Sequence, residues 1–99
     1  SEALKILTER LKHFNAHYKL NYSQVTIRDQ KGRWGSCSEK GSISFNYKLI
    51  LLPDEIRDYV VVHELCHLAE LNHSRNFWAL VGQTIPEYRK LRRRLRGLG

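Results

Sequence analysis

The segment VVVHELCHLAELNHSRNFW, residues 60–78, constrains the chain more than any other. A hydrophobic run from Val60 to Val62 leads directly into His63 and Glu64, and His67 follows His63 by four residues. Residues four apart lie one above the other on the same face of a helix. Polar groups on a hydrophobic helix are buried only when they are paired or bound, so these imidazoles need a partner.

The spacing H-E-x-x-H predicts that this partner is a metal ion. Two imidazoles one helical turn apart can bind the same zinc ion. Glu64 is rotated by about 100° from His63 around the helix axis, so it is poorly placed to ligate that ion but can reach a water molecule beside it. We therefore predict His63 and His67 as ligands of one Zn²⁺ per chain, and Glu64 as the general base of a peptide-bond hydrolase.

A catalytic zinc ion needs a third protein ligand, and the sequence offers two candidates. His73 follows His67 by six residues, beyond a chain break that Asn72 and Ser74 indicate, whereas Glu87 follows His67 by twenty. We favour His73, because the break frees it to swing back under the helix.

A closed site with four protein ligands would instead indicate a non-catalytic zinc-binding module. Cys37 or Glu87 would be the fourth ligand in such a site. For Cys37 we favour a packed thiol over a metal ligand. Replacing Glu64 by Gln distinguishes the two hypotheses, because hydrolysis depends on this carboxylate and a structural site does not.

The length of 99 residues predicts a single domain spanning residues 1–99. The longest uninterrupted hydrophobic runs have four residues, whereas a bilayer span needs about 20. No signal peptide is recognisable at the N-terminus. With Cys37 and Cys66 expected to be reduced, these features favour a cytoplasmic protein without a membrane partner.

Hydrophobic periodicity predicts an α+β fold. An amphipathic N-terminal helix is followed by a small, about three-stranded, antiparallel sheet, then by the helix that carries His63, and by two C-terminal helices. The expected helices cover residues 2–18, 53 to about 70, from 75 to about 82, and from about 85 onward; the expected strands lie at 24–29 and in the segments RWGSCS and SISFNYKLIL.

The net charge of +7 is concentrated at the C-terminus. It leaves nucleic-acid binding open without favouring it, because the last helix also carries a stripe of leucines that suits packing against the domain or against a second copy in a dimer. The six basic residues in the last eleven are Arg89, Lys90, Arg92, Arg93, Arg94 and Arg96.

The chain resembles the minigluzincin, or YgjP-like, zinc metallopeptidases over residues 33–90. The segments that carry this resemblance are RWGSCS, GSISFNYKLILLP, DYVVVHELCHLAELNHSRNFW and IPEYRK. It implies a minimal zincin-like fold, a histidine as third zinc ligand, which matches His73, and a peptide or protein substrate. Some members of this family are latent, with the C-terminal segment covering the cleft.

An extended peptide substrate would pair with an exposed sheet edge. We predict this edge at residues 42–46, with Ser42, Ser44 and Asn46 contacting the substrate. Candidates for stabilising the oxyanion are Tyr59, Tyr88 and Arg89.

The pattern H-E-L-x-H-x5-H-S-x-x-F-W also resembles the SprT- and WLM-type proteases that cut proteins crosslinked to DNA. This alternative predicts salt-sensitive DNA binding.

Overall fold

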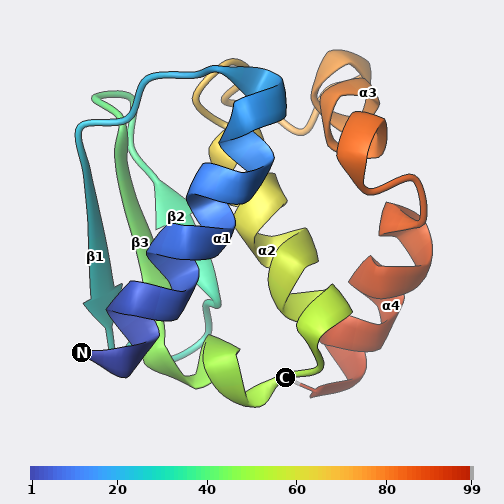
Figure 1. Ribbon diagram of the computed structural model, residues 1–99. Coiled ribbons are helices and arrows are strands. Elements are labelled where there is room, and N and C mark those ends of the chain that lie inside the picture. Colours follow the sequence, from blue (N-terminus) through green and yellow to red (C-terminus); the bar gives the residue numbers. More distant parts are fainter. Residues whose placement is uncertain (99) are drawn as a thin grey trace.

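The α+β class predicted from the sequence is confirmed by the computed structural model, which describes residues 1–98 (Figure 1). The predicted domain ends at Gly99, which lies outside the described residues. In chain order the elements are α1 (Glu2–Tyr18), β1 (Gln24–Arg28), β2 (Gly35–Cys37), β3 (Ser42–Asn46), the 3₁₀ helix η1 (Tyr47–Leu51), α2 (Asp54–Cys66), α3 (Arg75–Thr84) and α4 (Tyr88–Leu98).

The sheet is mixed, and the prediction of an antiparallel sheet is wrong for one of its two strand pairs. The strand order is β1-β3-β2, so β3 lies in the centre. β2 and β3 form the predicted antiparallel hairpin, with Ser36 opposite Ser44. β1 pairs with β3 in parallel, with Thr26 opposite Ser44.

Burial and one amide side chain explain why β3 takes the central position. Ile43 and Phe45 have no exposed surface, which makes β3 the most buried strand. The chain between β1 and β2 must therefore pass across the end of β3. Asn46 holds this crossing, because its Nδ2 donates to the carbonyl oxygens of Gln30 at 2.7 Å and Arg33 at 3.1 Å.

The predicted β-run SISFNYKLIL ends as a strand at Asn46 and continues as η1. The Oδ1 of Asn46 accepts a hydrogen bond from the backbone N–H of Lys48 at 3.0 Å, which is an N-terminal helix cap. The same side chain therefore closes the sheet and starts η1, which leads into α2.

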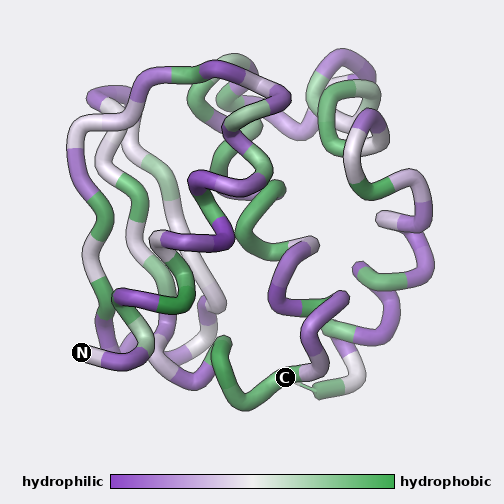
Figure 2. The backbone as a smooth tube through the Cα atoms, in the orientation of Figure 1, coloured by the Kyte–Doolittle hydropathy of each residue, from purple (hydrophilic) through white to green (hydrophobic). Residues whose placement is uncertain are grey.

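Helix α2 lies between the sheet on one side and α3 and α4 on the other, with α1 across it (Figure 1). Val61, Val62 and Leu65 on α2 have no exposed surface. Figure 2 shows the hydrophobic residues gathered in this interior, whereas α4 is mostly hydrophilic. The regular helix ends at Cys66, four residues before the predicted end, but His67 keeps right-handed helical angles.

Helix α1 follows the predicted boundaries and is bonded to α3 at its C-terminal end. The hydroxyl of Tyr18 lies 2.5 Å from the carbonyl oxygen of Leu80, to which it donates, and 2.9 Å from Oγ1 of Thr84. Burial raises the pKa of Tyr18 to about 12, so the hydroxyl stays protonated as a donor.

Helix α3 begins at the predicted residue and ends at Thr84, two residues later than predicted, and α4 begins at Tyr88, three residues later than predicted. Ser74 caps α3 by accepting a hydrogen bond from the N–H of Phe77 at 3.2 Å. Leu91 is buried against α2, and Arg94 forms an ion pair with Glu55 at the start of α2. Among residues 1–98, no helix is both long enough and hydrophobic enough to cross a bilayer.

Candidate metal centre and active site

Three histidines from two parts of the chain converge at the C-terminal end of α2. One nitrogen of each of His63, His67 and His73 lies within 4.8 Å of the others. The Nε2 atoms of His67 and His73 are 3.1 Å apart. The chain after α2 thus turns back and brings His73 to the face that carries the other two imidazoles.

The donor set and its dimensions fit a zinc ion. Zn–N bonds of about 2.0–2.1 Å in tetrahedral geometry place ligand nitrogens about 3.3 Å apart. The observed separations of 3.1 Å to at most 4.8 Å require only small side-chain movements to meet that value. Three imidazoles leave a fourth position open for a water molecule or a substrate, as a catalytic site requires.

Hydrogen bonds prepare His67 for ligation. Its Nδ1 lies 2.9 Å from the backbone carbonyl oxygen of Glu70, to which it donates in the tautomer that leaves Nε2 free of a proton. This Nε2 is the atom that faces His73. The backbone of Glu70, rather than its side chain, thus orients the ring.

Two aromatic residues, which the sequence analysis did not select, pack on the histidines. Phe77 stacks on His67, with ring centroids 4.4 Å apart and an interplanar angle of 23°. Trp78 stacks on His73 at 5.8 Å and 27°. The signal for both was available, because F-W at the start of a helix capped by Ser74 must lie close to His73.

Glu64 is buried against Gly35 of β2, a residue that the sequence analysis did not select. Only 5% of Glu64 is exposed. A Cβ atom at Gly35 would lie 3.0 Å from Cγ of Glu64 and 3.2 Å from its Oε2, closer than ordinary packing allows. Oε2 also lies 3.2 Å from Nδ1 of His63. The same Cβ atom would lie 3.1 Å from the carbonyl oxygen of Ser44, so a larger residue at position 35 would force the carboxylate or the strand to shift.

A pocket of about 330 Å³ opens beside Glu64 between β2, α2 and α4. Tyr59 contributes to its wall, and burial raises the pKa of Tyr59 to about 12, which keeps its hydroxyl protonated. The other two oxyanion candidates, Tyr88 and Arg89, line a different pocket. The residues that line the pocket beside Glu64 are Gly32, Arg33, Trp34, Gly35, Tyr59, Val60, His63, Glu64 and Leu95.

The predicted edge strand is wrong, because residues 42–46 form the central strand and pair on both sides. Ser44 and Asn46 are buried, and their side chains bond within the domain: Oγ of Ser44 to Oγ1 of Thr26 at 2.8 Å, and Asn46 to the crossing described above. Ser42 accepts a hydrogen bond from Gln24 at 3.2 Å. The geometry gives these three residues a structural role, and the strand that packs against Glu64 is β2.

The alternative ligands lie outside the histidine cluster. Within the described residues, the metal-ligand cluster contains neither Glu87 nor Cys37. Glu87 lines a separate pocket with Glu55 and Asp58. Burial, and then the charge of Glu64, raises the pKa of the Cys37 thiol to about 11, which opposes the thiolate form that binds metals.

The surroundings of His73 disfavour its protonation. Partial burial of the ring is the main cause that lowers the pKa of His73, and coulombic repulsion from His63, His67 and Arg92 adds to it. Only a neutral imidazole can bind a metal ion. His73 is thereby kept in its ligating form below the pH at which an ordinary histidine would be protonated.

The fold and this cluster define a metallopeptidase-type domain, and comparison with known proteins identifies the family. The model of the YgjP-like family, metallopeptidase domain, matches residues 1–97, and the chain belongs to this family. Membership supports a peptidase, which acts on peptides or proteins, and implies a metal ion. Comparison with curated proteins gives no significant match.

Two solved structures share the fold. The metallopeptidase zymogen of Pyrococcus abyssi abylysin is 26% identical, with a TM-score of 0.81 over 90% of this chain and 90% of that chain. The metallopeptidase zymogen of Methanocaldococcus jannaschii jannalysin is 17% identical, with a TM-score of 0.78 over 92% of this chain and 94% of that chain. The second likeness concerns the fold alone.

Proposed function

We propose that the protein is a zinc-dependent peptidase in which His63, His67 and His73 hold the ion and Glu64 is the general base. The convergence of three ligand nitrogens within 4.8 Å, beside a buried carboxylate, carries this proposal. A structural zinc site closed by four protein ligands has no counterpart among the described residues, since the cluster contains only the three histidines.

A bound zinc ion would act as a Lewis acid toward the scissile carbonyl and a water molecule. Glu64 takes the proton from the attacking water and delivers it to the leaving amine. Its burial against Gly35 fixes the carboxylate and shields it from bulk water. Tyr59 lines the adjacent pocket and keeps its hydroxyl protonated, which makes it the favoured donor to the developing oxyanion.

The free edge of β2 is where the substrate backbone would pair. Within the described residues, β2 is an edge strand that pairs with β3 alone, and its outer edge is the one at which an extended peptide would add a strand. Gly35 lies both at the start of β2 and on the wall of the pocket beside Glu64. Pairing at this edge would bring a peptide bond past the carboxylate.

Latency through the end of α4 is part of the proposal. Leu95 lines the same pocket as His63 and Glu64, and abylysin, which shares the fold, was solved as a zymogen. We expect that removal of residues 95–99 increases hydrolysis of an unstructured protein such as casein. Equal activity with and without these residues, at equal zinc content, would contradict latency.

The test of the proposed function is zinc content combined with hydrolysis. Wild-type protein should hold close to one zinc ion per chain, and His73→Ala should hold much less. Glu64→Gln should keep its zinc and fold while hydrolysis falls by about 10²–10⁴-fold. Undiminished hydrolysis in Glu64→Gln would exclude Glu64 as the base, and absence of zinc from the reconstituted wild type would refute the proposal.

A further inference from the structure

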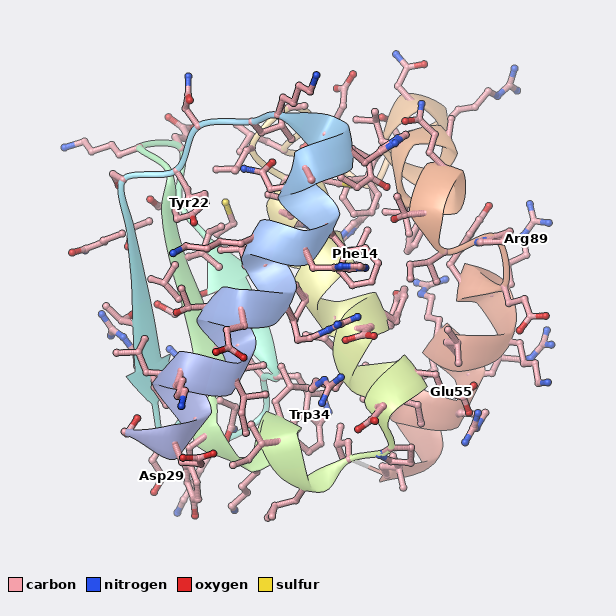
Figure 3. The ribbon with its side chains drawn as sticks, in the orientation of Figure 1. Phe14, Tyr22, Asp29, Trp34, Glu55 and Arg89 are labelled. Atoms are coloured by element: carbon pink, nitrogen blue, oxygen red, sulfur yellow. The ribbon has the colours of Figure 1, made fainter. Side chains whose placement is uncertain are left out.

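A second pocket, which the proposed mechanism does not use, lies between α3 and α4. Its volume is about 360 Å³. Arg89, which belongs to it, lies on the side of the molecule remote from the strands (Figure 3). We call the pocket and its walls the arginine–tryptophan subsite; it is lined by Arg75, Trp78, Ala79, Tyr88, Arg89 and Arg92.

The aromatic residues of this subsite form a flat support for the guanidinium groups. Trp78 and Tyr88 stack with ring centroids 5.1 Å apart and an interplanar angle of 14°. Cζ of Arg92 lies 5.1 Å from the ring centroid of Trp78, and Cζ of Arg89 lies 5.4 Å from that of Tyr88. A guanidinium held over an aromatic face keeps its N–H edge free for a planar, two-pronged acceptor.

The positive charge of the subsite is not neutralised within the domain. Arg10, Arg57 and Arg94 all form ion pairs with acidic residues. Within residues 1–98, the three arginines of the subsite form no ion pair. No acidic residue lines the pocket. Three arginines around one pocket without a carboxylate form a site for an anionic group from outside.

The subsite adjoins the candidate metal centre through Trp78. Trp78 lines the pocket and also stacks on His73, with ring centroids 5.8 Å apart. The ring centroids of Trp78 and His63 are 5.9 Å apart. An extended peptide advances about 3.3 Å per residue. A residue one or two positions from the scissile bond would therefore reach the arginines.

We infer that the arginine–tryptophan subsite binds a carboxylate group of the peptide substrate, next to the bond that is cut. This inference rests on the proposed function and adds a specificity to it. The carboxylate has two sources in a peptide, an Asp or Glu side chain and the free C-terminus. Both present the same planar pair of oxygens, for which the arginine fork is suited.

Small carboxylates test the subsite without any need for hydrolysis. We would follow the indole Nε1–H signal of Trp78 by NMR in the full zinc-loaded chain during titration with N-acetyl-aspartate methylamide, N-acetylglycine and neutral N-acetyl-asparagine methylamide. The first probe has a side-chain carboxylate and the second a terminal one, so their relative affinities distinguish the two sources. We expect a saturable shift with at least one carboxylate and none with the neutral probe.

Arg92→Gln and Arg93→Gln are matched variants for this titration, because both remove one exposed charge from α4 but only Arg92 lines the pocket. Binding of the carboxylate should weaken about tenfold in Arg92→Gln and stay unchanged in Arg93→Gln. Equal weakening in both variants, or an equal response to the neutral probe, would overturn the inference. The inference would also be overturned if a single-stranded oligonucleotide shifted the Trp78 signal and neither carboxylate did.

Hydrolysis separates this inference from the proposed function. Peptides that differ only by Glu or Gln beside the cleaved bond should differ about tenfold in kcat/KM, and Arg92→Gln should abolish that ratio. Carboxylate binding in a chain that cuts no peptide would refute the proposed function and leave the subsite intact. Hydrolysis without preference, together with no Trp78 shift, would refute the subsite alone.

Discussion

The two parts of the histidine cluster stand on different kinds of structure. His63 lies on α2 and His67 is the C-terminal cap of that helix, and their neighbours Val62 and Leu65 are fully buried. His73 lies on an exposed segment between α2 and α3, and its ring rests on Trp78. The helix thus positions two of the proposed ligands as the core folds, whereas the position of His73 depends on short-range packing and, under the proposed function, on the bound metal ion.

The largest expected effect is on the free energy of unfolding, and a matched pair of leucines, one on α2 and one beside His73, measures it. Leu65→Ala empties a fully buried position on α2 and should lower the free energy of unfolding by about 2–5 kcal/mol. Leu71, 50% exposed beside His73, should change it by less than about 0.5 kcal/mol when replaced by Ala. Urea unfolding of the metal-free proteins measures both, and similar values would erase the contrast between the regions.

The next effect tests α2 through the strand that packs on it, β2. Gly35→Ala should reduce hydrolysis by about ten- to a hundredfold while zinc content is kept, because the new methyl group displaces Glu64. Gly97→Ala is the control, since a Cβ atom there meets nothing within 4 Å. Full activity in Gly35→Ala would show that the carboxylate does not need its buried position.

A smaller effect concerns the pH dependence of stability that His73 contributes. The pKa of His73 is lowered from the ordinary 6.5, so the unfolded chain takes up this proton at a higher pH than the folded one. Stability linked to neutral His73 is therefore complete above about pH 6.5 and declines as the pH falls. His73→Gln should flatten this slope slightly in metal-free protein, measured by urea unfolding from pH 7.5 to 5. A steeper slope in the variant would reverse the assignment.

The smallest effect should come from the ion pair that joins α4 to α2. Arg94 lowers the pKa of the exposed Glu55 carboxyl from 4.5, so any stabilisation is present above that pH and is lost below it. Because this pair is open to solvent and screened by salt, Arg94→Gln should barely move the unfolding midpoint at pH 7. A large destabilisation would show that α4 is held chiefly by charge, and not by Leu91.

Periodicity and capping signals in the sequence were sufficient for the helices and for the gathering of His63, Glu64 and His67, because those depend on neighbours within a few residues. The parallel pairing of β1 with β3 was not predictable in this way. It depends on Asn46 binding the crossing at Gln30 and Arg33, a contact between residues far apart in the chain. The predicted substrate edge failed for the same reason.

The fit of Gly35 against Glu64 also lay beyond sequence reasoning. RWGSCS contains a glycine that could have served a turn, and only the packing of β2 on α2 shows that it makes room for a carboxylate. The salt-sensitive nucleic-acid binding and the dimer considered from the basic C-terminal helix stay predictions. The carboxylate subsite gives three arginines near this region a different role.

The bond from Tyr18 to Leu80 and Thr84 has a consequence for how the protein can be divided. The three clustered histidines, Glu64, Phe77 and Trp78 come after residue 58, and β2 adds Gly35, so a fragment that begins at the sheet would contain all of them. Such a fragment would lose the anchor that holds α3 in place, and with it the support of Trp78 under His73. The smallest functional unit of this peptidase therefore begins at α1, although none of the residues proposed for chemistry lies there.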